Sequence, residues 1–330
     1  MSRSAFVRSK VAPITVGVAV AAAVAAVHAC SRPSPSGAAA RDTVVVFVAA
    51  SLAKPLQPVF AAYSARTHAV IQAESGASVV LARRITELHR IPDLILLADP
   101  EVFPELLMPR HVTWYAQFAR NRMVVAYTAN SRYAAEIAPA NWMDVVRRPD
   151  VQVGRTDPAI APAGYRTLIM FQLAQRFYHR PGLADSLLAS APERNVRPDA
   201  SGTAALLAAG ELDYIYDYQS VAESNGFQFV ALPREIDLGD PSLASEYATA
   251  QVRVRRPGSD TTVAIAGQPI RYALSIPENA PHAAAGRRLM SDLLSPAAVR
   301  ELRAEHVDML DHPIVAGSNP PAELRDATGG

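Results

Sequence analysis

Short apolar runs alternate with segments of helical periodicity along most of this chain. Residues 43–50 form a continuous, largely β-branched run, which is typical of a strand buried on both faces of a parallel sheet. Apolar residues at helical spacing follow this run through Tyr63, and a second strand and helix follow from Val70. A third strand is expected at 93–98. The alternation predicts an α/β protein that begins with a parallel sheet.

The second half of the chain continues the alternation less regularly. Strands are predicted at 123–127, 151–154, 212–218 and 227–232. Helices are predicted at 142–146, 167–178 and 201–209. Residues 251–254 and 270–276 are expected to form an antiparallel return, and one last helix is expected over 281–303.

The first thirty residues carry the pattern of an export signal. Three basic residues within the first ten positions precede an Ala- and Val-rich run over 11–27, which Val27-His28-Ala29-Cys30 closes. The run is a little shorter than the ~20 apolar residues of a membrane span. Its end resembles a lipobox, in which Cys30 would become the lipid-modified first residue. Cleavage without a lipid and an uncleaved anchor are the alternatives.

The cysteine count agrees with a role for Cys30 outside the fold. It is the only cysteine of the chain, so no intramolecular disulfide can form. Residues 31–41 are rich in Ser, Pro and Ala and read as a flexible tether. We therefore expect an extracytoplasmic protein, in the periplasm or at the outer face of the cytoplasmic membrane, held there by a lipid anchor only.

Composition narrows the classes of function. Apolar residues make up 50% of the chain, which allows a sizeable core, and 32 basic against 31 acidic side chains give a net charge of +1. Without a basic stripe, nucleic acid is not expected as a partner. The sequence holds no G-x-S-x-G elbow and no histidine pair at metal-ligand spacing. We expect a binding protein without a cofactor rather than an enzyme.

Three turns that lead from a strand end into a helix start could hold an anion. Ser51 and Ser78 follow the first two strands, and the stretch from Gly154 to Thr167 has two prolines and two glycines in its first eleven residues. Helix N-termini at the carboxyl ends of strands present free N–H groups, which bind anions without requiring a cation. The alternative for each serine is an ordinary N-cap. Asp213 and Asp217 share one face of a predicted strand, with Asp213 expected at the surface.

Four blocks of the sequence resemble the extracytoplasmic molybdate/tungstate-binding proteins of ABC importers, in particular the subgroup common in archaea. The blocks are Phe47–Leu52, Gly76-Ala77-Ser78 with Ala82-Arg83-Arg84-Ile85, Gly154–Arg166, and Gly210–Ala222. They stand in the family's order and cover about 43–310. The resemblance implies a two-lobed, type II periplasmic-binding-protein-like α/β fold, each lobe a mixed sheet flanked by helices, that closes on an oxyanion.

The same resemblance implies the domain organisation and the site. Lobe one would comprise residues 42–121 and 246–318, lobe two residues 122–245, and residues 319–330 a flexible tail. The implied ligand-binding residues are Ala50, Ser51 and Ser78 from lobe one with Gly164, Tyr165, Arg166 and Asp217 from lobe two. The bound ligand would be molybdate or tungstate, the partners ABC permease subunits, and the protein a monomer.

The sequence departs from the subgroup in the loop before Gly164. Ala161 stands where the subgroup has an Asp that approaches the metal, whereas Asp217 keeps the other carboxylate position and is the candidate direct ligand of the metal. Asp157 is a candidate substitute for the missing carboxylate. A carboxylate that faces a dianion without bonding its metal is repulsive unless it is protonated or hydrogen-bonded elsewhere.

Three further side chains keep two interpretations each. Arg166 either reaches the anion or forms a salt bridge that fixes a lobe, and Tyr165 and Tyr218 either line the cleft or belong to the core. The leading hypothesis is capture of molybdate or tungstate for an ABC importer. One alternative is the same clamp binding another oxyanion or a small carboxylate. The other is an exported enzyme or sensor subunit on the same fold.

Overall fold

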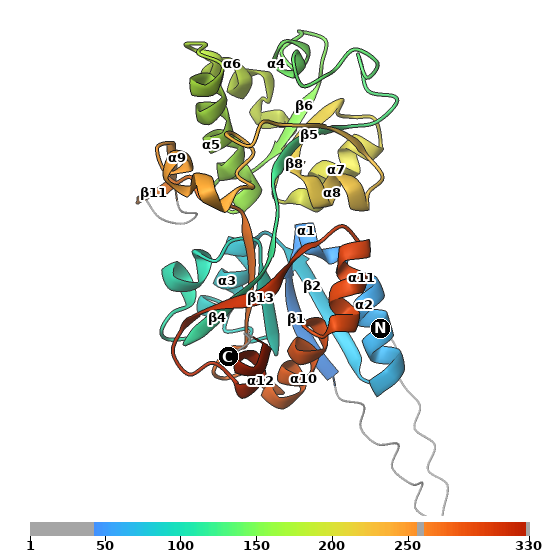
Figure 1. Ribbon diagram of the computed structural model, residues 1–330, viewed down its shortest axis with the longest axis vertical. Coiled ribbons are helices and arrows are strands. Elements are labelled where there is room, and N and C mark those ends of the chain that lie inside the picture. Colours follow the sequence, from blue (N-terminus) through green and yellow to red (C-terminus); the bar gives the residue numbers. More distant parts are fainter. Residues whose placement is uncertain (1–42, 256–260, 328–330) are drawn as a thin grey trace, which may run out of the picture. The chain divides into compact units, whose positions relative to one another are not determined.

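The computed structural model describes residues 43–255 and 261–327, and its elements carry the labels of Figure 1. The predicted signal peptide over 1–30, with Cys30, and the predicted tether over 31–41 lie outside the described residues. Over the described ranges, no helix is long and apolar enough to span a bilayer.

The first of two large sheets has six strands in the order β13-β4-β12-β3-β1-β2. The strands are β1 (Thr43–Ala49), β2 (Val70–Gly76), β3 (Leu94–Leu97), β4 (Trp114–Arg120), β12 (Arg271–Ser275) and β13 (Asp308–Gly317). β1 is parallel to β2 and β3, whereas β12 is antiparallel to β3 and β4. We call this sheet and its helices lobe one.

Helices cover both faces of the lobe-one sheet (Figure 1). They are α1 (Ala50–Ala53), α2 (Leu56–Thr67), α3 (Ser78–Thr86), the π-helical turn η1 (Phe103–Leu107), α10 (Ala283–Leu293), α11 (Pro296–Ala304) and α12 (Ala322–Ala327). Side chains of β1 alternate between the faces, so Val46 and Val48 pack in the cluster that includes α2, α10 and α11. Phe47 packs with α3 on the opposite face.

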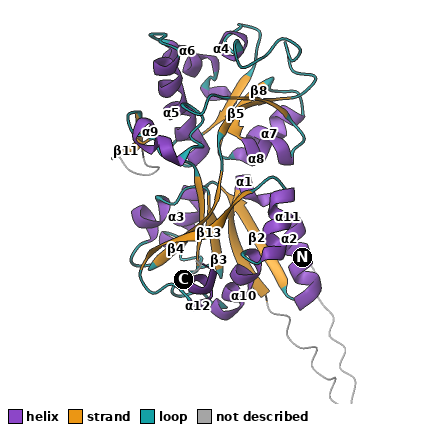
Figure 2. Ribbon diagram, viewed as in Figure 1, coloured by secondary structure: helices purple, strands orange, loops and turns teal. Residues whose placement is uncertain are grey.

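The second large sheet has five strands in the order β7-β6-β8-β5-β9. They are β5 (Met123–Tyr127), β6 (Val153–Thr156), β7 (Val196–Arg197), β8 (Tyr214–Tyr218) and β9 (Gln228–Ala231). Its helices are α4 (Trp142–Val145), α5 (Pro162–Phe177), α6 (Leu183–Ser190), η2 (Glu193–Asn195), α7 (Ala200–Ala208), α8 (Gln219–Ser224), η3 (Pro241–Leu243) and α9 (Ala244–Tyr247). We call this group lobe two; Figure 2 shows its helices flanking the sheet.

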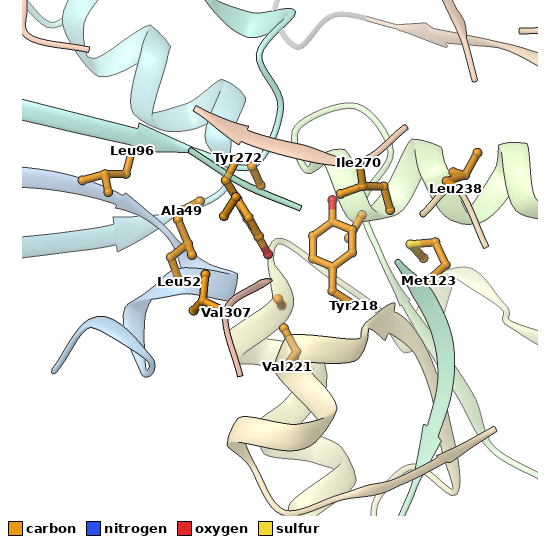
Figure 3. Close-up of a cluster of buried hydrophobic side chains, with 14 of the residues drawn as sticks. Ala49, Leu52, Leu96, Met123, Tyr218, Val221, Leu238, Ile270, Tyr272 and Val307 are labelled. Atoms are coloured by element: carbon orange, nitrogen blue, oxygen red, sulfur yellow. The ribbon is translucent and has the colours of Figure 1, made fainter. Parts of the chain in front are cut away.

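The chain passes between the two sheets after β4 and returns before β12. Near these crossings, Tyr218 of β8 and Tyr272 of β12 share one buried cluster (Figure 3). Their rings lie 6.1 Å apart at 80°, an edge-to-face contact. The cluster thus joins an aromatic residue from each lobe.

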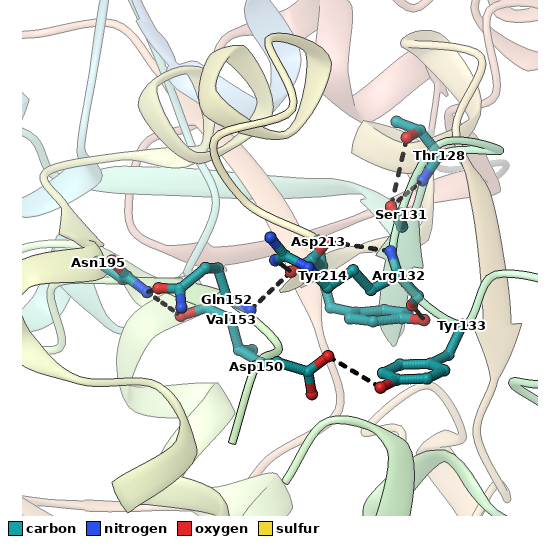
Figure 4. Close-up of polar contacts among 10 residues, drawn as sticks. All are labelled: Thr128, Ser131, Arg132, Tyr133, Asp150, Gln152, Val153, Asn195, Asp213 and Tyr214. Carbon is teal, nitrogen blue, oxygen red and sulfur yellow. Dashed lines mark hydrogen bonds and ion pairs between the residues drawn. The ribbon is translucent and has the colours of Figure 1, made fainter. Parts of the chain in front are cut away.

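Asp213 is buried, which corrects the expectation that it lies at the surface. Its carboxylate accepts hydrogen bonds from the backbone N–H groups of Arg132 (3.0 Å) and Gln152 (2.7 Å), and from the Arg132 guanidinium at 2.8 Å (Figure 4). A buried carboxylate is tolerated when all its bonds are satisfied in this way. Asp213 therefore fixes loops of lobe two and is not a ligand candidate.

Three predicted elements near the C-terminus differ in the structure. Residues 251–254 belong to β10 (Gln251–Arg255), which pairs with β11 (Thr262–Ala266) in a separate two-stranded sheet and not with 270–276. The helix expected over 281–303 is two helices, because Pro296 cannot continue a helix and Ser295 caps the second one through Ala298 N–H at 3.3 Å. The expected flexible tail contains α12, in which Leu324 is buried.

Candidate functional site

A small cavity lies where the starts of four helices, α1, α3, α5 and α7, come together with Tyr218. It is lined by Ala49, Ala50, Ser51, Gly76, Ala77, Ser78, Ala98, Ala161, Pro162, Ala163, Asp199, Ala200 and Tyr218. The cavity volume is about 20 Å³, measured as the space open to the centre of a water-sized sphere. On the same measure, one water molecule needs roughly 10–15 Å³. The space suits an ion of a few heavy atoms and is too small for a sugar or a peptide.

Ser51 and Ser78 bring hydroxyl groups to this cavity from the two parallel strand ends of lobe one. The Ser51 Oγ accepts a hydrogen bond from the Tyr272 hydroxyl at 3.1 Å, and the Ser78 Oγ accepts one from the Ala98 N–H at 3.0 Å. Because a protein donor already occupies an oxygen lone pair in each case, the hydroxyl proton is left to donate to a ligand. Both serines are therefore arranged as donors.

The backbone adds further donors, because the first N–H groups of a helix have no acceptor within it. Ala50, Ser78 and Ala163 lie in the first turns of α1, α3 and α5, and Ala200 begins α7. The aligned peptide dipoles place partial positive charge at these ends. No Lys, Arg or His appears among the described residues that line the cavity. The site is built to hold an anion with neutral donors.

Arg166 and Tyr165 connect the lobes beside the cavity instead of lining it. The Arg166 Nη1 donates to the Ala98 carbonyl (2.5 Å) and to the Tyr218 hydroxyl (2.6 Å), and its Nη2 lies 3.3 Å from the Asp99 Oδ1. The Tyr165 hydroxyl donates to the Asp99 Oδ2. We call these two side chains and Asp99 the interlobe clasp. Of the two interpretations of Arg166, the structure contains the salt bridge.

The clasp residues are buried, and their charges compensate each other. Burial by itself would lower the pKa of Arg166, but the nearby Tyr218, Asp99 and Tyr165 raise it by more. The net shift of the pKa is upward, so the guanidinium stays charged. Burial, with the charge of Asp99, raises the pKa of Tyr165 well above its usual value, so the phenol stays a donor. Asp99 follows β3 in lobe one and the other two residues lie on α5, so the clasp ties the lobes together.

Asp217 does not line the cavity. Its Oδ1 accepts from the Tyr218 N–H at 2.8 Å and its Oδ2 from the Thr203 hydroxyl at 3.0 Å, and the side chain is fully buried. Burial raises the pKa of this carboxyl to about 7, although both hydrogen bonds oppose the shift. In this structure the candidate metal ligand holds Thr203 and the Tyr218 backbone in place.

The loop before α5 brings Ala161 to the cavity and keeps Asp157 away from it. The Asp157 Oδ1 accepts from the Ala159 N–H at 2.8 Å, so this carboxylate closes its own turn. Gly164 packs against that turn, where an added Cβ would lie 2.6 Å from the Thr156 carbonyl oxygen and from two other backbone atoms. Gly164 therefore allows the loop to approach the helix and does not itself line the cavity.

Sequence reasoning missed Asp199 and Ala200, which line the cavity from lobe two. The available signal was an N-cap pattern, since the Asp199 Oδ1 accepts from the Gly202 N–H at 3.1 Å at the start of α7. That pattern marks a helix start but does not show which helix starts meet. The described residues hold no cluster of three or more His, Cys, Asp or Glu side chains that could bind a metal ion.

Two mixed sheets flanked by helices, joined by two crossings and enclosing a small cavity, define the periplasmic-binding-protein class of fold. The chain belongs to the family described as bacterial extracellular solute-binding protein, which matches residues 44–306. It is thus an extracytoplasmic binding protein, and its family is not one of enzymes. The family resemblance and the two-lobed α/β fold that the sequence predicts are both confirmed.

Some similar proteins are named only as solute-binding proteins, and others are named for molybdate and tungstate. An uncharacterized solute-binding protein of Petrotoga mobilis is 40% identical over 240 residues, 72% of this chain and 75% of that protein. The molybdate/tungstate-binding protein WtpA of Thermococcus kodakarensis is 30% identical over 311 residues, 86% of each chain. WtpA of Pyrococcus abyssi is 30% identical over 310 residues, 86% of this chain and 88% of that protein.

Two solved structures confirm the fold alone, because their sequences are distant. The sulfate-binding protein SubI of Mycobacterium tuberculosis H37Rv aligns with a TM-score of 0.59 at 14% identity, over 87% of this chain and 90% of its own. The periplasmic molybdate-binding protein of Azotobacter vinelandii aligns with a TM-score of 0.51 at 15% identity, over 80% of this chain and 98% of its own.

Proposed function

We propose that this protein captures molybdate or tungstate and delivers it to the permease of an ABC importer. The observation that carries the proposal is the small cavity, where the Ser51 and Ser78 hydroxyls and four helix starts supply neutral donors. Hydrogen bonds to a charged acceptor, made by buried donors such as Ser51 and Ser78, are stronger than those between neutral groups. The two relatives named for molybdate and tungstate support this choice of anion.

Isothermal titration calorimetry of the folded protein with molybdate, tungstate, sulfate and phosphate tests the proposal. We expect tight, saturable binding of molybdate and tungstate at one site and much weaker binding of sulfate. Absence of heat with both metal oxyanions, in a protein shown to be folded by its thermal transition, would refute the function.

A second candidate is the same clamp holding another oxyanion or a small carboxylate. Ala161 favours it, because this position lines the cavity without the carboxylate that the molybdate/tungstate subgroup places there. Phosphate or a small carboxylate would then bind tightly while tungstate failed to compete.

We further propose that Cys30 carries a lipid and that the mature protein acts as a lipid-anchored monomer. The sequence pattern around Cys30 supports a processed lipoprotein signal. Expression of wild type and Cys30→Ser, followed by membrane fractionation and fatty-acid labelling, tests the anchor. Label and membrane association are expected for wild type and should be lost in the variant. An equally labelled variant would exclude Cys30 as the attachment point.

A further inference from the structure

Asp199 lines the cavity, and within residues 43–255 and 261–327 no cationic side chain pairs with it. Asp199 caps α7 through its Oδ1, which accepts from Gly202 N–H at 3.1 Å, and the described residues offer no bonded partner to its Oδ2. The nearby Arg197 donates to the carbonyls of Arg194 (2.9 Å) and Val196 (2.7 Å) instead. Beyond the N–H groups at the start of α7, no described residue bonds this carboxylate, so no side-chain cation offsets its charge beside the cavity.

Other charges at the site do not neutralise it. Arg166 already pairs with Asp99 in the interlobe clasp. Asp217 is the other carboxyl group near α7, and it is buried. Burial is the main cause that raises the pKa of Asp217, and the charge of Asp199 raises it as well. An entering anion therefore meets the field of Asp199 directly.

A carboxylate next to an oxyanion is unfavourable unless the two share a proton in a hydrogen bond or the carboxylate oxygen binds the central atom of the oxyanion. An oxygen that carries a proton can donate it to the carboxylate, as monohydrogen phosphate can. The metal of molybdate or tungstate can accept a further oxygen ligand. Sulfate at neutral pH has no proton to donate, and its sulfur accepts no further oxygen ligand.

We propose that Asp199 is a selectivity residue, whose carboxylate excludes sulfate from the cavity while admitting oxyanions that offer it a proton or a metal centre. This inference deepens the proposed function and rests on it for the identity of the preferred ligand. It makes charge a basis of discrimination between anions, since like charges brought together at a binding site cost several kcal/mol.

The variant Asp199→Asn removes the charge and keeps the fold, because an asparagine Oδ1 also caps the Gly202 N–H. Asp185→Asn is the matched control, since it makes the same change at an exposed position in the first turn of α6. Calorimetry at pH 7.5 would measure sulfate, phosphate, molybdate and tungstate binding to wild type and both variants. Should Asp199→Asn not fold, Asp199→Ser retains a cap and serves the same purpose.

Sulfate affinity is expected to rise at least about tenfold in Asp199→Asn, with a smaller gain or a loss for molybdate and tungstate, and Asp185→Asn should match wild type. An unchanged sulfate affinity in a folded variant, or an equal gain for all four anions, would overturn the inference. If wild type binds neither molybdate nor tungstate, the proposed function fails. The sulfate comparison between Asp199→Asn and wild type still decides the role of Asp199.

Discussion

At the scale of single residues, the site depends on hydroxyl groups whose oxygens are already engaged. The Asn121 Nδ2 donates to the Tyr272 hydroxyl at 2.8 Å, and that hydroxyl donates to the Ser51 Oγ. These two hydrogen bonds link Asn121, just after β4, and Tyr272 of β12 to Ser51, and they orient the Ser51 side chain just after β1. The geometry of one donor is thus set by two residues that lie far from it in the sequence, one of them 221 positions away.

Ser51→Ala should weaken molybdate or tungstate binding by roughly 10- to 100-fold, because a hydrogen bond to a charged group contributes about 1.5–3 kcal/mol. Tyr272→Phe keeps the Ser51 hydroxyl and removes only the group that orients it, so a smaller loss is expected. Calorimetry on both variants makes the measurement. Equal losses would mean that Tyr272 itself contacts the ligand, and no loss in Ser51→Ala would remove Ser51 from the site.

Asp217 makes the stability of the protein depend on pH. Its pKa is about 7 in the folded state because of burial, whereas the pKa of an unfolded Asp is about 3.9. The folded state binds the extra proton between these values, so the free energy of unfolding falls as pH rises from about 4 to about 7 and then levels off. Asp237, whose pKa burial raises to about 6, acts in the same direction.

Urea unfolding of wild type and Asp217→Asn between pH 5 and 8 measures this dependence. The variant should lose part of the wild-type slope, which for one group is at most about 1.4 kcal/mol per pH unit. Asparagine can still accept from the Tyr218 N–H and donate to Thr203. Identical slopes in the two proteins would show that Asp217 is ionised throughout this range.

At the scale of elements, α5 has two functions in successive turns. Its first residues, Pro162 and Ala163, line the cavity, and the next turn supplies Tyr165 and Arg166 to the interlobe clasp. Its start also bonds lobe one through the preceding loop, where the Ile160 carbonyl accepts from the Val79 N–H at 3.2 Å. The proposed ligand contact and the interlobe clasp are therefore linked through one helix.

Tyr165→Phe should speed ligand release several-fold with little change in the association rate, because it removes one clasp bond and no ligand contact. Tyr178→Phe, at the other end of α5, is the matched control; its hydroxyl accepts a hydrogen bond from the Trp142 indole at 3.4 Å and takes no part in the clasp. Stopped-flow measurements give both rates. A changed association rate with an unchanged release rate would argue against a clasp that holds the closed state.

At the scale of the whole molecule, the ligand should act as part of the fold. The cavity wall takes residues from both lobes, Ser51 and Ser78 from lobe one and Asp199 and Tyr218 from lobe two. A ligand held by both lobes binds the native state and not the unfolded chain, so it stabilises by mass action.

Molybdate or tungstate at 100 times its dissociation constant should raise the free energy of unfolding by about 2.7 kcal/mol. Differential scanning calorimetry over a series of concentrations should show Tm rising with the logarithm of ligand concentration. Sulfate at the same concentrations serves as the ionic-strength control. An equal shift with sulfate would indicate general anion stabilisation instead of specific binding.

Much of the fold could be predicted because its signals are local. The β-branched run of β1, the helical spacing of α2 and the Gly- and Pro-rich loop before α5 all lie within a few turns of sequence. Strand order at the sheet edges could not be read in this way. β12 lies between β3 and β4, and β13 returns beside β4, through contacts between distant segments.

The sequence by itself determined which helix starts follow which strands, and hence that Ser51 and Ser78 share one edge of a parallel sheet. Only the tertiary structure decided which acidic side chain reaches the cavity. Asp213 and Asp217 form hydrogen bonds within lobe two, Asp157 closes its own turn, and Asp199 lines the cavity. The reason is physical: a strand or helix start follows from neighbouring residues, whereas burial and partners follow from packing between segments far apart in the chain.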